Sequence, residues 1–177
     1  TDGLVTALDF SNLVSYESGD SSGYSLTGSV GFDLFNTPTD TTAFGGGITC
    51  QETDEFIALD DKIATDYVSV ECWWTRDSDG VSTSEDIVWN KEATWELRDD
   101  NGNSSWALKA DNKNWFWHDS TADIAVGETI HFVLTYDGNY VKSYKNGELI
   151  QTYSYPGGGV LSSQTSCYPK LNSRHCN

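Results

Sequence analysis

The stretch HFVLTYDGNYVKSYKNGELIQTY, residues 131–153, contains two turn signals and three short runs of alternating side chains. Bulky and β-branched residues alternate over 131–136 and again over 140–145, which is the period-2 pattern of a half-buried strand. The pairs Asp137-Gly138 and Asn146-Gly147 separate the runs, and such pairs favour two-residue hairpin turns with positive φ at both positions. The stretch therefore predicts three antiparallel strands joined by two tight turns.

The same organisation extends through the whole chain of 177 residues. Short strand-like runs alternate with turn signals, and no amphipathic helix pattern interrupts them. This arrangement predicts an all-β fold, a two-sheet antiparallel jelly-roll sandwich, in one domain over residues 1–177. We expect the two sheets to bury a core that includes Val68, Val70, Trp74, Phe132, Leu134 and Leu149.

The composition is strongly acidic, with 27 Asp and Glu against 10 Lys and Arg and a net charge of −17. Nucleic-acid binding requires cations that neutralise phosphates, so this charge excludes a nucleic-acid partner, and it excludes an anionic membrane surface as well. We expect no membrane insertion, because the sequence has no apolar run long enough to cross a bilayer. The chain begins Thr1-Asp2-Gly3 and contains no Met, from which we expect a processed product or part of a longer polypeptide.

Four cysteines, at positions 50, 72, 167 and 176, allow three disulfide pairings. A local bridge between Cys167 and Cys176 is one alternative, because both lie in a turn-rich segment. Cys72 shares the alternation of Val68, Val70 and Trp74 and is predicted to lie in the core. No Cys and His set has the spacing of a zinc site, and none is typical of thiol catalysis.

Seven Trp residues make the chain rich in large aromatic rings, and four of them fall within residues 95–117. Aromatic faces stack on the apolar side of sugar rings, while nearby Asp, Asn and Arg side chains fix the orientation by hydrogen bonds. The alternative for any one Trp is core packing. The predicted ligand-binding residues, for a glycan, are Trp95, Arg98, Trp106, Trp115, Trp117 and Asp119.

The acidic segment around residues 52–61 raises two further questions, metal binding and catalysis. Calcium prefers hard oxygen ligands, and the predicted metal ligands are Asp54, Glu55, Asp60 and Asp61, with a solvated acidic turn as the alternative. A glycan-cleaving enzyme needs a pair of carboxylates at a fixed separation. Glu52 with its neighbours and the isolated Glu96 do not supply such a pair, so we expect no catalysis.

The order YVSVECWW, DIVWNK, WELRDDNGN, WALKA and VGETIHFVLTYDGNYVKSYKNGELI resembles the laminin-G-like, concanavalin A-like jelly-roll family. His131, Thr135, Tyr136, Asp137, Gly138, Tyr144, Asn146 and Gly147 match that family's hairpin signature in spacing and type. The N-terminal segment GLVTALDFSNLVSYESGDSSGYSLTGSVGFDL is similar to a variant found in structural proteins of tailed phages. The resemblance implies a jelly roll and a function among lectins, glycosidases, lyases and spacer modules.

The sequence departs from the family pattern in two places. Thr129-Ile130 stands where the family usually has Trp, and the family's last strand, which pairs beside the first, is missing after YPKLNSRHCN. The strand at residues 3–10 would then have an open edge, where we expect another chain of an assembly to pair. The function expected is a non-catalytic structural or adhesion module in contact with glycans, extracellular or on a virion surface. The alternatives are a glycan-cleaving enzyme and a purely structural subunit.

Overall fold

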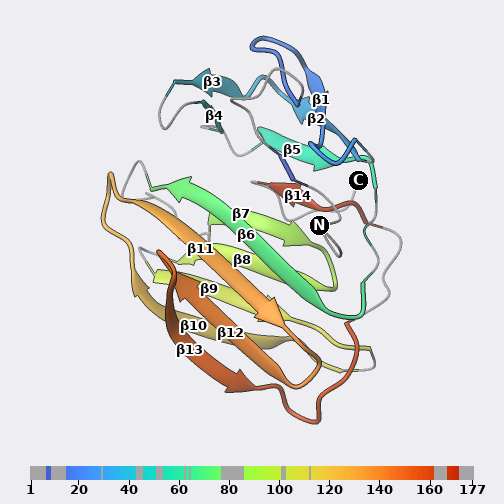
Figure 1. Cartoon of the computed structure of the whole chain (residues 1–177), viewed down its shortest axis with the longest axis vertical. Coiled ribbons are helices and arrows are strands. Elements are labelled where there is room, and N and C mark those ends of the chain that lie inside the picture. The colour runs from blue at the N-terminus through green and yellow to red at the C-terminus, as the bar shows by residue number, and fades with distance from the viewer. Residues whose placement is uncertain are drawn as a thin grey trace. The chain divides into compact units, whose positions relative to one another are not determined.

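A computed structural model describes residues 7–8, 15–28, 30–42, 46–50, 54–61, 63, 65–76, 86–100, 103–111, 113–161 and 167–171. Every regular element in these ranges is a β-strand, as predicted, and the pairs between them are antiparallel (Figure 1). No helix in the described ranges is long and apolar enough to cross a membrane. The chain divides into two compact units, unit 1 and unit 2, so the single domain expected over residues 1–177 stays a prediction.

Unit 1 comprises Thr1–Ile63, Trp89–Lys91 and Thr165–Asn177. Its strands are β1 (Ser22–Tyr24), β2 (Gly31–Phe35), β3 (Thr39–Thr41), β4 (Gly47–Thr49), β5 (Phe56–Leu59), β14 (Lys170–Leu171) and the last half of β7 (Asp86–Lys91). They lie in the order β1-β2-β5-β14-β7, with β3 and β4 forming a separate hairpin. The core of this unit consists of Tyr16, Val30, Phe32, Ile57 and Leu59.

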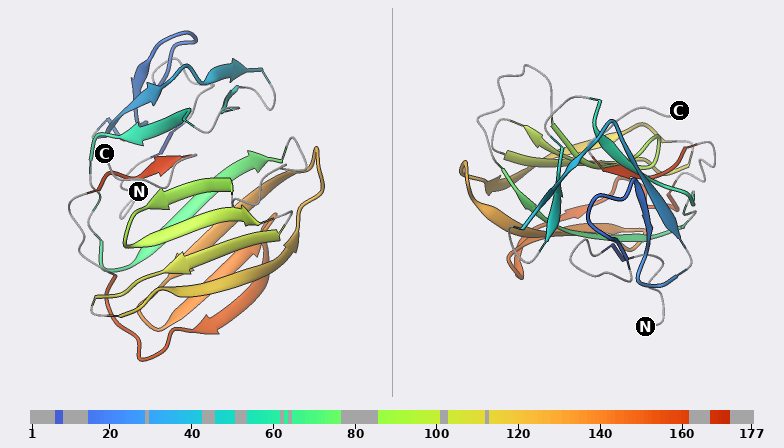
Figure 2. Two further views of the ribbon diagram at one scale, coloured as in Figure 1. Left: turned by 180° about the vertical axis from the view of Figure 1, so that it is seen from behind. Right: turned by 90° about the horizontal axis from the view of Figure 1, so that it is seen from above.

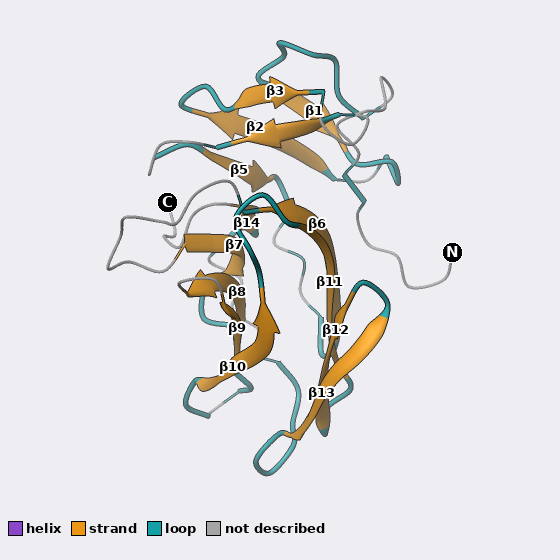
Figure 3. Ribbon diagram, turned by 90° about the vertical axis from the view of Figure 1, so that its left-hand side faces the viewer, coloured by secondary structure: helices purple, strands orange, loops and turns teal. Residues whose placement is uncertain are grey.

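Unit 2 comprises Ala64–Val88 and Glu92–Gln164 and contains the hairpin stretch quoted above. Its strands are β6 (Val68–Thr75), the first half of β7, β8 (Trp95–Asp100), β9 (Asn103–Leu108), β10 (Phe116–Asp123), β11 (Thr129–Tyr136), β12 (Tyr140–Lys145) and β13 (Glu148–Ser154). One layer has the order β8-β9-β10 and the other has the order β13-β12-β11-β6. The two layers face each other as a sandwich, which Figure 3 shows edge-on.

The interior of this sandwich follows from strict alternation along the strands. In β11, Ile130, Phe132, Leu134 and Tyr136 are buried, while the residues between them are half-exposed. Trp106 of β9 is fully buried, and its ring lies 6.0 Å from that of Tyr153 in the opposite layer. Burying such rings removes large apolar areas from water, on the order of 2–3 kcal/mol for each side chain, so this interior holds the two layers together.

The predicted core is confirmed for Val70, Phe132 and Leu134, whereas Val68 and Trp74 are half-buried and Leu149 is 55% exposed. Leu149 is the clear error. A β-bulge shifts the register between Ser143 and Tyr144, so Ser143 pairs with Gln151 but Tyr144 pairs with Leu149. The extra residue reverses the inside–outside alternation of β13, which places Leu149 on the outer face.

The two predicted turns differ from each other. Asn146 and Gly147 have φ values of 53° and 85°, as a two-residue hairpin turn requires. The turn at Asp137 has three residues between the strands, and only Gly138 has positive φ, at 95°. Asp137 Oδ1 accepts hydrogen bonds from the N–H groups of Asn139 and Tyr140, at 2.9 and 2.7 Å. This side-chain-capped turn replaces the predicted two-residue turn.

Candidate functional site

The candidate site lies on the outer face of the β8-β9-β10 layer, which is turned toward the viewer in the left-hand view of Figure 2. Along β10, Phe116 and His118 point inward, because their rings pack 5.9 and 5.3 Å from the ring of the buried Trp106. Trp117 falls between them and therefore points outward, with 42% of its surface exposed. The alternation of the strand thus presents one large ring to solvent.

Arg98 of β8 reaches the same outer face. Its Cζ lies 4.4 Å from the centroid of the Trp117 ring, and its Nε donates a 2.6 Å hydrogen bond to Ser105 Oγ on the intervening strand β9. Trp117 pairs with Ala107 of β9. The side chain of Ala107 is a single methyl group, and this residue is fully buried. The guanidinium and the small Ala107 therefore fix the indole ring against the sheet.

Trp115 extends the aromatic surface beyond the start of β10. Its ring centroid lies 5.5 Å from that of Trp117, with the two planes inclined by 33°. Trp115 also lines a cavity of ≈ 190 Å³, together with Lys113, Asn114, Phe116, Tyr155 and Pro156. We name Arg98, Trp115, Trp117 and this cavity the tryptophan surface.

The tryptophan surface has the groups that a polar, ring-shaped ligand requires. Two indole faces offer apolar stacking area, and the exposed Lys113 and Asn114 place N–H donors and an amide carbonyl beside it. A cavity of this size is smaller than a site for a drug-sized molecule. The arrangement therefore suits one or two small rings that carry hydroxyl groups on their edges.

The structure brings together three of the six predicted ligand-binding residues, Arg98, Trp115 and Trp117. Two others belong to the core and not to a site, because Trp106 is 0% exposed and Trp95 is 6% exposed. Both lie on the inner face of their strands, opposite in alternation to Arg98 and Trp117. The Asp119 backbone pairs with Ser105, but its side chain lies outside the described residues.

Sequence reasoning missed Lys113 and Asn114. They belong to the Asp-Asn-Lys-Asn turn that directly precedes Trp115, and the sequence pattern marks that turn only as a separator between strands. A turn next to an outward aromatic residue places its polar groups beside the ring, and this adjacency could have identified both residues as members of the site. Tyr155 and Pro156 had no signal of this kind, because they arrive from the far end of β13.

The predicted calcium ligands are not brought together. Asp54 and Glu55 precede β5, while Asp60 and Asp61 follow it, so the strand separates the two pairs. Asp60 Oδ1 accepts a 2.7 Å hydrogen bond from Gly31 N, and Asp61 Oδ1 accepts one of 3.2 Å from Ile63 N. Among the described residues, no group of three or more His, Cys, Asp or Glu side chains is placed to hold a metal ion. The structure thus gives Asp60 and Asp61 local structural roles, as acceptors of backbone hydrogen bonds.

The remaining predictions concern cysteines and the first strand. Cys50 and Cys72 are free thiols, and burial raises the pKa of Cys72 to about 12, so this thiol is unreactive at neutral pH. Cys167 is disulfide-bonded, while Cys176, one of the alternatives for its partner, lies outside the described residues. Most of the edge at residues 3–10 also lies outside them. Ala7 O accepts a 2.8 Å hydrogen bond from Leu26 N of the same chain.

Comparison with solved structures finds similar folds in binding domains. The ligand binding domain of botulinum neurotoxin serotype D in complex with N-acetylneuraminic acid matches with TM-score 0.71 and 17% identity, over 94% of this chain and 44% of that one. Domain 4 of AbnA, an extracellular arabinanase of Geobacillus stearothermophilus in complex with arabinotriose, matches with TM-score 0.64 and 15% identity, over 86% and 79%. The binding domain of Paraclostridial mosquitocidal protein 1 matches with TM-score 0.66 and 13% identity, over 91% and 44%. The chain thus spans less than half the length of the two toxin domains.

Among curated proteins, none matches the sequence significantly. A family model does match, over residues 51–168, and its description is the concanavalin A-like lectin/glucanases superfamily. The match covers all of unit 2, including both layers of the sandwich and the tryptophan surface. Because it extends over more than half of the sequence, and the all-β sandwich agrees with it, the protein belongs to the concanavalin A-like lectin/glucanases superfamily.

Proposed function

We propose that the protein is a non-catalytic glycan-binding module, displayed on an extracellular or virion surface and used for adhesion. The observation that carries the proposal is the tryptophan surface. Arg98 fixes Trp117 from one side, Trp115 continues the ring surface, and a cavity adjoins them. Ring faces flanked by hydrogen-bonding side chains are what a carbohydrate requires of a binding site.

The exposure of Trp117 lowers the stability of the unbound protein, and a binding role for this ring would explain why it is exposed. A ring with 42% of its surface in water forgoes part of the burial energy that the core Trp residues contribute. The contacts with Arg98 and Trp115 hold that ring in place before any ligand arrives. A preordered ring loses little conformational entropy on binding, which favours affinity for a weakly apolar ligand such as a sugar.

The similar structures also support a glycan ligand. One of them is a ligand binding domain in complex with N-acetylneuraminic acid, and another is an arabinanase domain in complex with arabinotriose. Their identities of 17% and 15% establish a shared fold, and fold alone does not fix the ligand. The sugars themselves are therefore useful as first probes of this chain.

Two alternatives from other classes are testable. A glycan-cleaving enzyme needs an accessible carboxylate pair, but Glu96, on the same side of β8 as Arg98, is only 3% exposed. Its burial supports a non-catalytic role. Glu52 lies outside the described residues. A purely structural subunit would bind no glycan, and it needs no exposed ring on this face.

The test is a glycan array probed with three labelled proteins: the natural chain, Trp117→Ala and Tyr24→Ala. Tyr24 is a matched control, because it is an exposed aromatic residue of β1 with 65% of its surface in water. The proposal predicts that a related set of glycans binds the natural chain and the Tyr24 variant, and that Trp117→Ala loses this set.

The same glycans are then incubated with the natural chain and analysed for cleavage products. Release of smaller sugars would move the protein to the enzyme class. Absence of binding to any glycan, by a natively folded chain, would favour the purely structural alternative. Equal binding by all three proteins would place the site somewhere other than the tryptophan surface.

A further inference from the structure

A second exposed tryptophan lies in unit 2, on the layer opposite the tryptophan surface. Trp73 of β6 is 70% exposed, more than any other large apolar side chain in the described ranges. It lies on the outer face of the β13-β12-β11-β6 layer, because its neighbour Trp74 points inward and packs 6.1 Å from Phe132. Most of its indole surface is therefore open to water.

Trp73 is supported on one side by its cross-strand partner. His131 pairs with Trp73 in the β6–β11 register, and the two rings are stacked, with centroids 4.6 Å apart and planes inclined by 21°. His131 Nε2 lies 3.0 Å from Glu71 Oε1, close enough for an ion pair when the ring is protonated. One indole face is thus occupied by the imidazole ring.

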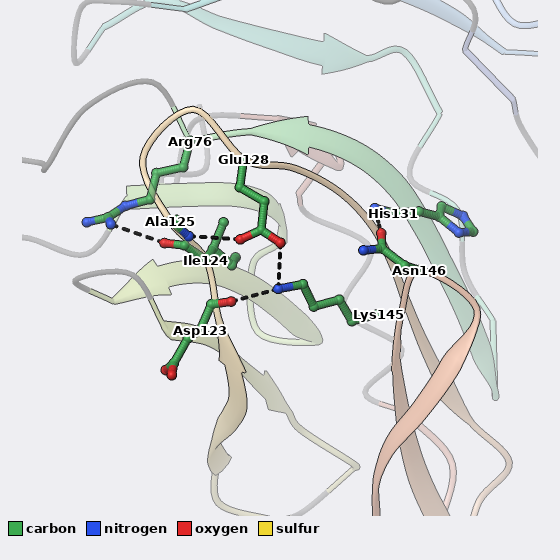
Figure 4. Close-up of polar contacts among 8 residues, drawn as sticks. All are labelled: Arg76, Asp123, Ile124, Ala125, Glu128, His131, Lys145 and Asn146. Carbon is green, nitrogen blue, oxygen red and sulfur yellow. Dashed lines mark hydrogen bonds and ion pairs between the residues drawn. The ribbon is translucent and has the colours of Figure 1, made fainter.

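The backbone on which these rings stand is fixed at the same end of the layer (Figure 4). Asn146 Oδ1 accepts a 2.9 Å hydrogen bond from His131 N, and Asn146 N donates one of 2.8 Å to His131 O. Just after β6, Arg76 pairs with Asp99 at 3.0 Å and donates to Ile124 O at 3.2 Å. The two strands that carry Trp73 and His131, β6 and β11, are therefore both held in place by polar contacts.

The surroundings of Trp73 decide what kind of ligand it suits. Its neighbours along β6 on the same face are Glu71, with 65% of the side chain exposed, and Thr75. Thr75 Oγ1 and Thr129 Oγ1 share one 2.7 Å hydrogen bond, which leaves a free O–H donor and several lone pairs on this hydroxyl pair. A stable protein interface has an apolar core and buries on the order of 1,000 Å² or more, whereas this surface is one ring with a polar rim.

We propose that Trp73, Glu71 and the Thr75–Thr129 pair form a second carbohydrate-binding site. A sugar ring stacks its apolar face on the open side of the indole and donates hydroxyl protons to Glu71 and the threonines. The inference rests on the proposed function, because it assigns a second site to the same class of ligand.

Two sites on opposite outer faces of one sandwich change what the module does. The tryptophan surface belongs to the β8-β9-β10 layer and the Trp73 site to the layer behind it, so the two sites point away from each other (Figure 3). A single glycan of two or three rings cannot occupy both. One protein chain can instead bridge two glycan chains, and a surface carrying many copies gains avidity.

The experiment observes each site separately. All seven Trp are replaced biosynthetically by 5-fluorotryptophan, and the ¹⁹F resonances of Trp73, Trp115 and Trp117 are assigned with single Trp→Phe variants. The probes are arabinotriose, N-acetylneuraminic acid, maltotriose, chitotriose and the strongest glycan from the array. The inference predicts saturable shifts of the Trp73 resonance with at least one probe. Glu71→Ala should weaken that Kd about tenfold and leave the responses of Trp115 and Trp117 unchanged.

Each other outcome counts against a specific statement. If Trp115 and Trp117 respond to a probe while Trp73 does not, the second site is refuted and the proposed function stands. If none of the three resonances responds to any probe, both are refuted. If the Trp73 resonance instead moves with protein concentration in the absence of sugar, this face is a contact between copies of the chain and the second site is again refuted.

Discussion

Arg98 lies over the indole ring of Trp117, with Cζ 4.4 Å from the ring centroid, and donates from Nε to Ser105 Oγ at 2.6 Å. The hydrogen bond sets the direction of the guanidinium, and the guanidinium sets the plane of the ring. Three adjacent strands thus cooperate to hold one exposed side chain. In the proposed function Arg98 is a positioning residue, which acts through Trp117.

Removing this contact should weaken binding moderately. Exposed cation–π contacts contribute about 0.5–1 kcal/mol, so Arg98→Ala is expected to raise the Kd for the best array glycan about two- to fivefold. Arg98→Lys should fall between the natural chain and Arg98→Ala, because it keeps the charge without the planar fork. Isothermal titration measures the Kd, with Lys142→Ala on the opposite layer as the control. Equal affinities for all four proteins would show that Arg98 does not position the ring.

The buried Trp106 predicts a stability effect. It is 0% exposed, and its ring contacts Phe116, His118 and Tyr153 across both layers. Trp106→Ala should lower the free energy of unfolding by about 3–5 kcal/mol, through lost burial and the cavity that remains. Denaturant unfolding measures it, and Trp73→Ala is the exposed control. A loss below about 1 kcal/mol for Trp106→Ala would contradict the assignment of this residue to the core.

The two hairpin glycines should respond differently to substitution. At Gly147, φ is 85° and a Cβ would meet no atom within 4 Å, so Gly147→Ala costs only backbone strain, about 1 kcal/mol. At Gly138, φ is 95° and a Cβ would lie 2.7 Å from Tyr67 Cε1. Gly138→Ala should therefore cost more in thermal unfolding, and adding Tyr67→Ala should recover part of the difference. Equal costs at both positions, unaffected by Tyr67→Ala, would contradict this contact.

A pH dependence is expected from Glu128, which Figure 4 shows between Ala125 and Lys145. The hydrogen bond from Lys145, and then that from Ala125 N, lower the pKa of Glu128. A carboxylate with a lowered pKa in the fold stabilises the fold above its unfolded pKa, about 4.3, and this contribution disappears as the pH falls through the folded value. The Tm difference between the natural chain and Glu128→Gln should therefore be largest near neutral pH and vanish in acid.

The control for this titration is Glu17→Gln, which removes an exposed carboxylate from unit 1. Its effect on Tm should stay small at every pH. A Tm difference for Glu128→Gln that persisted unchanged to strongly acidic pH would show that the ionised carboxylate is not what stabilises the β10–β11 loop.

The sequence was sufficient for the fold because its strand signals are local. Alternation in 131–136 and the Asn146-Gly147 turn each depend on a few adjacent residues, and the structure confirms both. The bulge at Ser143 could not be read in this way. It is a property of the pairing between β12 and β13, and it reversed the inside–outside position of Leu149.

The candidate site was predictable only in part for a similar reason. The segment Trp115-Phe116-Trp117-His118 shows that two rings share one face of a strand, but not which face is outside. Because Trp95 and Trp106 are close in sequence to these rings, they are predicted to bind the ligand as well. The register of the β8–β9 pair instead places both on the inner face. The cavity is lined by residues at the start of β10 and by residues that follow β13. No local sequence pattern connects Asn114 with Tyr155.

The central claim is that the tryptophan surface binds a glycan, and the most direct measurement is a titration of the Trp115→Ala/Trp117→Ala double variant. Central aromatic residues of a binding site often contribute about 2 kcal/mol or more, so the Kd for the best array glycan should rise about thirtyfold or become unmeasurable. The double variant should keep its cooperative unfolding, because neither ring belongs to the core. A folded double variant that binds this glycan with the affinity of the natural chain would contradict the account.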